Sequence, residues 1–241
     1  MNERQGRLLV TIIDQFIETA MPVGSGHLLE AAGLALSAAT IRHEMSLLED
    51  EGFLLQPHIS AGRIPTAEGY RVYVKEFMQP TVYERRVRQR FETLKAQYYQ
   101  RKDQERAYEA VALLAQMIPN VAFATVPHKH RVYYMGLANV LRQPEFRTDP
   151  LLASGVVEVL EGRLADVLDQ IPPDERVQYY IGDEHLLPQI QSCSLVVTRY
   201  TIGEGGRESE GMIGILGPMR MDYAYNTVAL ELVADLLCAS T

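Results

Sequence analysis

Residues 37–66 read SAATIRHEMSLLEDEGFLLQPHISAGRIPT, and this stretch decides the fold of the first part of the chain. Ser37 is a favourable N-cap for a helix over residues 38–51. The apolar stripe of this helix recurs at helical spacing and comprises Ala38, Ile41, Met45 and Leu48. Gly52 ends the helix, and two short extended segments, FLLQP and RIPT, then flank the tip HISAG. The pattern predicts a helix followed by a small hairpin.

Two further helices are predicted before this stretch. RLLVTIIDQFIETA, residues 7–20, is amphipathic, and Pro22 and Gly24 stop it. Ser25 is placed to cap a second, shorter helix that ends at Gly33, and the loop GLAL has the glycine often found in a helix-turn-helix. Three helices and a hairpin describe a winged helix-turn-helix. A small α+β domain without a role in nucleic-acid binding fits the same pattern about equally well.

Composition limits the class of protein. The 241 residues carry a net charge of −8 and a pI near 5.3, so the chain is not expected to coat nucleic acid non-specifically, although it can carry a local DNA-binding face. No apolar run approaches the roughly 20 residues that cross a bilayer, and the charged N-terminus does not resemble a secretory signal. Cys193 and Cys238 have no CxxC spacing, which predicts neither a zinc site nor a disulfide framework and favours a cytoplasmic location.

The rest of the chain divides into a helical segment and a layered domain. Thr66 can cap one more helix, which completes a first domain over residues 1–78. Residues 79–118 lack glycine and proline after Pro80 and are predicted to form a long connecting helix, or two helices with a break. In residues 119–241 strands and helices interleave, which indicates an α/β or α+β layer domain. Within it, GEGGRESEG (Gly203–Gly211) is predicted as a polar hairpin loop.

The connecting segment combines an apolar seam with positive charge. Its seam steps by four, three and four residues and consists of Val87, Phe91, Leu94 and Tyr98. This spacing motivates the prediction that two copies of the chain associate. Between Glu84 and Arg106 the net charge is +4, so a basic helix beside a DNA-binding domain could contact phosphates. A solvated helix face is the commoner explanation of such a charge run.

The sequence gives little support for catalysis. His185 stands beside Asp183 and Glu184, but neighbouring residues on one strand or turn do not converge on a site, so ordinary surface structure is favoured. The other histidines for which no partner arrangement is evident include His58, His128 and His130. The motifs GxSxG, HExxH and the Walker glycine loop are absent from the sequence. We therefore predict no enzyme, no cofactor and no metal site.

The third helix carries the better functional hypothesis. Its first turns can reach base edges in the major groove, where the Ala39 methyl group can touch a thymine methyl group and Arg42 can clamp a guanine or a phosphate. In the hairpin, or wing, Ser60 and Gly62 leave room for a phosphate backbone, and Arg63 is expected as an isolated cation that holds a phosphate or enters the minor groove. The residues predicted to bind DNA are Ser25, His27, Ser37, Ala39, Thr40, Arg42, His43, Ser60, Gly62 and Arg63.

Several stretches carry a family resemblance. They are LALSAATIRHEMSLLEDEGFLLQPHISAGRIPTAEGYRVYV, VYYMGLANVLRQPEF, IGDEHLLPQIQSCSLVVTRY and GMIGILGPMRMDYAYNTVALELVADLL. Together they resemble the heat-inducible transcription repressor HrcA family. The resemblance implies a dimeric repressor whose winged helix binds an inverted repeat upstream of chaperone operons. It also implies a reduced GAF-like domain in residues 119–241 of an α+β chain, and a chaperonin that helps keep the repressor active.

Three departures from the family pattern stand out. Members usually carry a large middle segment, with an inserted dimerisation module, where this chain has only PNVAFATVPHKH. Gly26 and His27 replace a usual Lys and Thr, which removes a cation that could face phosphate. His43 replaces a usual Asn, and Ile59 replaces a usual Thr beside the wing tip. The operator sequence is therefore expected to differ while the mode of DNA binding is retained.

Two other functions remain open from the sequence. The first is a regulator whose GAF-like domain senses a small ligand, which would require a pocket with converging polar groups. The second is a winged helix used only for protein contacts, for which the acidic run Glu49–Glu51 is the one hint.

Overall fold

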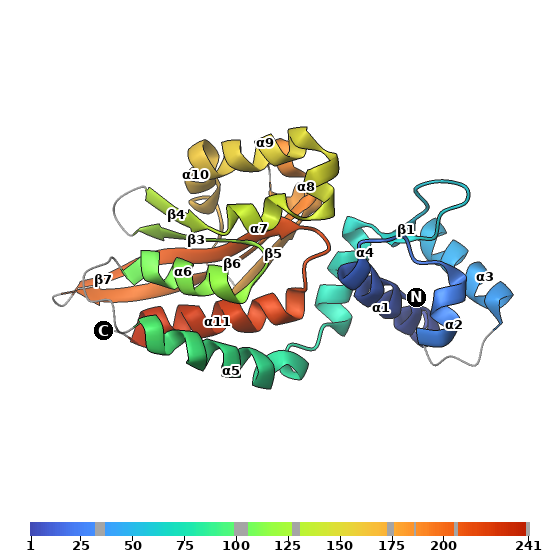
Figure 1. Cartoon of the computed structure of the whole chain (residues 1–241), viewed down its shortest axis with the longest axis horizontal. Helices are drawn as coiled ribbons and strands as arrows, with labels where there is room; N and C mark the ends of the chain where they lie inside the picture. The colour runs from blue at the N-terminus through green and yellow to red at the C-terminus, as the bar shows by residue number, and fades with distance from the viewer. Residues whose placement is uncertain are drawn as a thin grey trace. The chain divides into compact units, whose positions relative to one another are not determined.

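The structure is a computed structural model that describes residues 1–31, 37–98, 106–126, 131–172, 176–185, 187–204 and 207–239. The chain separates into two units, Met1–Met78 and Gln79–Thr241 (Figure 1). The predicted GLAL turn, residues 33–36, lies outside the described residues, as do His128 and His130.

The first unit begins with three helices, α1 (Glu3–Thr19), α2 (Ser25–Ala31) and α3 (Ala38–Asp50). A capping box between Asn2 and Gln5 starts α1, and Ala20 ends it in the left-handed conformation. Ser25 is itself the first residue of α2, so the predicted cap falls one position too late. The side chains that fill the core between the three helices are fully buried and include Leu8, Leu9, Ile12, Ile13, Leu28, Ile41 and Leu48.

A small antiparallel sheet completes the winged helix-turn-helix. Strand β1 (Leu54–Leu55) pairs with β2 (Ile64–Pro65), and an isolated bridge joins Val23 to Arg63. Thr66 then caps α4 (Ala67–Val72), as predicted, by accepting a hydrogen bond from the Gly69 N–H. A π-helical turn, η1 (Tyr73–Phe77), ends the unit.

The second unit is built on one antiparallel sheet of five strands. These are β3 (Val121–Val126), β4 (Arg131–Met135), β5 (Val177–Ile181), β6 (Cys193–Glu204) and β7 (Arg207–Pro218), in the order β4-β3-β7-β6-β5. Because every pairing is antiparallel, the unit is α+β and has the architecture expected of a GAF-like domain.

The hairpin between β6 and β7 is longer than the sequence suggested. Thr201 pairs with Glu210 and Glu204 pairs with Arg207, so much of the stretch 203–211, predicted as a loop, belongs to strands. Backbone pairing does not depend on side-chain polarity, and this explains why a polar, glycine-rich stretch continues the ladder.

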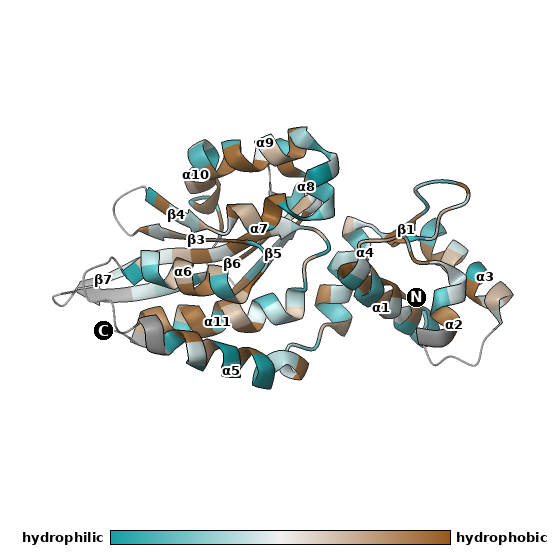
Figure 2. Ribbon diagram, in the orientation of Figure 1, coloured by the Kyte–Doolittle hydropathy of each residue, from teal (hydrophilic) through white to brown (hydrophobic). Residues whose placement is uncertain are grey.

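Helices α6 (Arg106–Met117) and α11 (Tyr223–Ala239) cover one face of the sheet, and α5 (Thr81–Tyr98) packs on these two helices (Figure 1). The segment 79–118 thus contains two described helices that pack on α11 within the second unit. Val87 and Phe91 are buried there. The seam of α5 is therefore covered by α11 and α6 of the same chain, and it does not support the predicted association of two copies. Figure 2 shows more hydrophilic colour on α5 than on α11.

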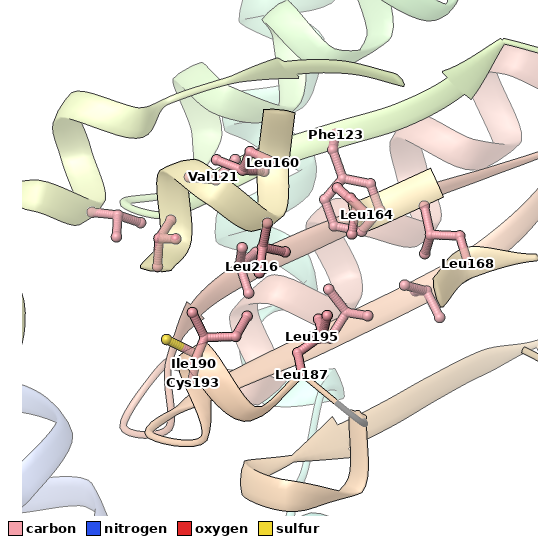
Figure 3. Close-up of a cluster of buried hydrophobic side chains, with 14 of the residues drawn as sticks. Val121, Phe123, Leu160, Leu164, Leu168, Leu187, Ile190, Cys193, Leu195 and Leu216 are labelled. Atoms are coloured by element: carbon pink, nitrogen blue, oxygen red, sulfur yellow. The ribbon is translucent and has the colours of Figure 1, made fainter. Parts of the chain in front are cut away.

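Shorter helices cover the opposite face. They are α7 (Leu137–Leu141), α8 (Pro144–Thr148), α9 (Pro150–Glu158), the π-turn η2 (Val159–Arg163), α10 (Leu164–Leu168) and the 3-10 turns η3 (Gly182–His185) and η4 (Pro188–Ile190). Between them and the sheet lies an apolar core in which Phe123, Leu164, Leu195 and Leu216 lie together (Figure 3).

Candidate nucleic-acid interface

The N-terminus of α3 is held by two of the predicted DNA-binding residues. The Ser37 Oγ accepts a hydrogen bond from the Thr40 N–H at 3.1 Å, and the two hydroxyl oxygens lie 2.9 Å apart. Ser37 is exposed and Thr40 is half-buried. The cap fixes the first turn of the helix, from which a recognition helix contacts base edges.

The outward face of α3 carries the other predicted residues of this helix. Ala39, Arg42 and His43 are exposed, while Ile41 and Met45 are buried, as the apolar stripe predicted. Arg42 donates from Nε to the Ala38 carbonyl oxygen at 3.3 Å. Among the residues that the structure describes, its guanidinium forms no ion pair. Arg42 is therefore a cation available to an incoming anion.

A buried acid on α3 was missed by the sequence analysis. Glu44 is only 2% exposed and forms a salt bridge with Arg4 of α1. Glu44 lies three residues after Ile41 and four before Leu48, which places it on the inward face of the helix. The helical spacing alone could therefore have predicted its burial. Because a buried carboxylate requires a partner, the pair ties the recognition helix to α1.

The wing is braced against α3 by Glu49. The Glu49 Oε2 lies 2.8 Å from the Arg63 Nη2, and its Oε1 accepts a hydrogen bond from the Gln56 N–H at 3.1 Å. The Arg63 side chain is only 17% exposed. The expectation of an isolated, projecting cation is therefore wrong, because Arg63 lies where the β2 edge meets the end of α3. One carboxylate holds both stems of the wing.

Gly62 is needed for packing within the unit. A Cβ atom at this position would lie 2.3 Å from the carbonyl oxygen of Val23. The Arg63 N–H donates to that same oxygen, and the Val23 N–H donates to the Arg63 carbonyl oxygen, both at 2.9 Å. The side of Gly62 on which a Cβ would stand thus faces the backbone that joins α1 to α2, and its contact with a DNA phosphate stays a prediction.

The tip of the wing presents an apolar side chain. The Gln56 side-chain amide donates to the carbonyl oxygens of Ile59 at 3.0 Å and Ala61 at 2.9 Å, which shapes the loop. Ile59 is 100% exposed, and the neighbouring His58 and Ser60 are exposed as well. Ser60 is therefore accessible as predicted, and Ile59 is a candidate contact that the predicted set did not include.

At the start of α2, Ser25 is half-buried and His27 is exposed. In the second unit the Glu184 carboxylate accepts a hydrogen bond from the Ile181 N–H at 2.7 Å, so this acid near His185 stabilises a turn. Within the described part of the chain, no cluster of three or more His, Cys, Asp or Glu could hold a metal ion. In the same part, no helix is both long and apolar enough to cross a membrane.

A capped helix with an exposed outward face, next to a wing held in place by that helix, defines a winged-helix protein of the DNA-binding class.

Comparison with known proteins identifies the family. Residues 72–226 match the family model described as HrcA protein C terminal domain. The heat-inducible transcription repressor HrcA of Desulforudis audaxviator is 30% identical, and the alignment covers 96% of this chain and 95% of the relative. That of Desulforamulus reducens is 31% identical over 93% and 92% of the two chains. The chain belongs to the HrcA family of transcription repressors, which are not enzymes.

This chain is a shortened member of the family. The alignment with the D. audaxviator relative extends over 331 positions, 90 more than the 241 residues present here. A solved structure described as a hypothetical protein superimposes with a TM-score of 0.77 at 18% identity and covers 99% of this chain and 97% of its own. That likeness concerns the fold alone.

Proposed function

We propose that this protein represses heat-shock and chaperone genes by binding an inverted-repeat operator in double-stranded DNA. The observation that carries the proposal is the outward face of α3, where Ala39, Arg42 and His43 are exposed beside a braced wing. The names of its relatives as heat-inducible repressors support the same function.

The chemistry of α3 suits contact with base pairs. In the major groove, Arg42 offers a planar pair of donors to the O6 and N7 of a guanine, and the Ala39 methyl group suits a thymine methyl group. Thr40 and His43 lie on the same part of the helix, and Ser37 remains exposed at its start. At the wing, Ile59 and Ser60 would face the sugar-phosphate backbone or the minor groove.

The proposal is tested by replacing Arg42 with Ala. Binding is measured by fluorescence anisotropy on the DNA upstream of this gene and of the chaperone genes of the same genome. If Arg42 contacts a base, Arg42→Ala should weaken operator binding by about 1–3 kcal/mol, or roughly 5- to 150-fold, and relax the preference at one position.

The matched control is Arg7→Ala, which removes an exposed arginine that pairs with Glu3 on α1 at 2.8 Å. This variant should bind the operator as the wild type does. Wild-type protein that bound upstream and random DNA alike would contradict the proposed function. If Arg42→Ala and Arg7→Ala lowered operator affinity equally, Arg42 would not be a DNA contact.

The proposed repressor acts as a homodimer, because an inverted repeat matches two recognition helices related by a two-fold axis. Family membership supports the dimer. A chaperonin that keeps the repressor active is part of the same proposal, since heat would relieve repression by engaging the chaperonin elsewhere. Added chaperonin should then raise the fraction of operator DNA bound, and unfolded competitor protein should reverse that rise.

A small-ligand site on the α9 and α10 side of the sheet receives less support than DNA binding. On the sheet face toward α9 and α10, apolar side chains fill the core (Figure 3). The hollow beside Val167, Tyr180 and Leu195 has a volume of about 70 Å³. Pockets for organic ligands usually have volumes of roughly 300–1,000 Å³. The acidic run Glu49–Glu51, which suggested a protein-only role for the wing, is weakened as support because Glu49 is paired with Arg63.

A further inference from the structure

A polar pocket opens on the other side of the sheet, between α5, the end of α6 and the start of α11. Its volume is about 600 Å³, and all of its lining residues belong to the second unit. The polar residues around it are Arg86, Gln89, Arg90, Thr93, Asp222 and Asn226. None of these residues has a role in the proposed DNA contact.

Contacts with neighbouring groups hold the side chains of Arg86 and Arg90 in place. Arg86 and Arg90 are four residues apart on α5 and therefore lie on one face of that helix. The Arg86 Cζ lies 5.4 Å from the ring centroid of Tyr83 and 5.3 Å from that of Tyr225. Arg90 donates from Nη2 to the carbonyl oxygen of Gln116 at 2.5 Å. Each contact leaves other guanidinium N–H groups for a ligand.

Asn226 supplies the observation that points to a ligand. Its residue is only 1% exposed, yet its side-chain Nδ2 has no hydrogen-bond partner in the described part of the chain. A buried amide without an acceptor destabilises a fold unless a bound group or a water molecule satisfies it. Asn226 is one of the residues that line the pocket, but its Nδ2 has almost no accessible surface. An acceptor in the pocket can therefore supply the missing bond once the Asn226 side chain turns toward it.

The charges around the pocket favour an anion. Arg86 and Arg90 outweigh the one acid, Asp222, whose Oδ1 already accepts a hydrogen bond from the Tyr225 N–H at 3.0 Å. Burial raises the pKa of the Asp222 carboxyl, whereas its hydrogen bonds and Arg86 lower it. The N-terminus of the long helix α11 adds positive potential at the same place.

We infer that this pocket binds a small organic anion whose phosphate or carboxylate group lies between Arg86, Arg90 and Asn226. The open pocket leaves room for a larger molecule around the anionic group. Phosphate and carboxylate share the chemistry that bidentate arginine recognises. The inference does not depend on the proposed DNA binding, because the ligand site and the DNA face use different residues.

Isothermal titration calorimetry of the full chain without DNA tests the site. The probes are inorganic phosphate and acetate, each added at constant ionic strength set with sodium chloride. We expect saturable binding of one probe molecule per chain, and the stronger of the two probes assigns the anionic group as phosphate or carboxylate. The variants Arg90→Gln and Asn226→Asp should each weaken that binding at least about tenfold.

Arg88→Gln is the matched control, because Arg88 lies on the same helix, pairs with exposed Glu84 at 3.1 Å and does not line the pocket. It should bind the probe as the wild type does. Circular dichroism establishes that each variant is folded, and Arg90, being exposed, gives a test that does not disturb the core. Absence of saturable heat with both probes would overturn the inference, as would equal weakening in Arg88→Gln and Arg90→Gln. Operator binding is measured separately, so its failure leaves this result unaffected.

Discussion

At the scale of single residues, the role of Arg63 that the structure indicates differs from the role that the sequence predicted. A sequence shows one cation in a run of small residues, but it does not show which acid is near in space. Glu49 precedes Arg63 by 14 positions and nevertheless lies 2.8 Å away, because the chain reverses through the wing. We therefore assign Arg63 to positioning the wing.

Paired substitutions distinguish positioning from phosphate contact. If Arg63 positions the wing, Glu49→Ala and Arg63→Ala should each weaken operator binding by a similar factor, and the double variant should be no weaker than either. Each should also lower the free energy of unfolding by about 1–3 kcal/mol, since a half-buried charged group loses its partner. Anisotropy titrations and urea unfolding measure the two effects.

Asp50→Ala is the control for this pair, because Asp50 is exposed on the adjacent position of α3. Stronger DNA binding by Glu49→Ala would mean that the freed arginine reaches phosphate. In that case the slope of log Kobs against log salt concentration should also steepen by about one unit.

Gly62 gives a second prediction at this scale. In Gly62→Ala the new methyl group would meet the Val23 carbonyl oxygen at 2.3 Å, so backbone must shift, and we expect a loss of about 1–3 kcal/mol in the free energy of unfolding. The control is Gly26→Ala, where a Cβ would meet no atom within 4 Å inside α2. Gly26→Ala should leave stability unchanged or raise it by about 0.5–1 kcal/mol. Equal melting temperatures for the two variants would contradict the packing role.

At the scale of helices and strands, the periodic patterns predicted where elements form, but they did not predict which elements pack or pair with one another. The stripe of α3, the caps at Ser37 and Thr66 and the helical character of the described parts of segment 79–118 all follow from local chemistry. The seam of α5 was correctly identified as a face to be covered, but a period cannot tell a helix of the same chain from one of a second copy. The β6–β7 hairpin was underestimated for a related reason, since strand pairing is a long-range event.

The two cysteines provide a prediction about elements. Cys193 starts β6 and is fully buried, and burial raises the pKa of its thiol, whereas Cys238 near the end of α11 is exposed. Because the thiolate is the reactive form, a water-soluble disulfide reagent should modify one thiol per native chain and two in denaturant. Cys238→Ser should abolish the native reaction, and a persistent signal in that variant would show that β6 opens.

At the scale of the whole molecule, the shortened chain must still associate if it is to read an inverted repeat. The relative from D. audaxviator aligns over 90 positions more than this chain contains, and the α5 seam is covered internally. The sequence resemblance was sufficient to predict the family and the fold class, but residues 79–118, predicted as a separate connecting helix, belong to the second unit. It could not predict the surface that joins two copies, because that surface depends on what the shortened segment leaves accessible.

Light scattering tests this association. We expect a particle of twice 27.1 kDa in the presence of operator DNA, after subtraction of the mass of the DNA. Half-site DNA serves as the control, since it removes the symmetry that favours a pair. One protein chain on a full operator would contradict the dimeric repressor.

The internal pairing of arginines has a consequence for how such a repressor would search a genome. Arg4 is paired with Glu44, Arg7 with Glu3 and Arg63 with Glu49, so these three arginines of the first unit would release few counterions when the protein meets DNA of arbitrary sequence. Encounters with non-operator DNA should then be brief. The repressor would spend little time bound elsewhere on the chromosome, and a modest number of molecules would suffice to occupy a few operators.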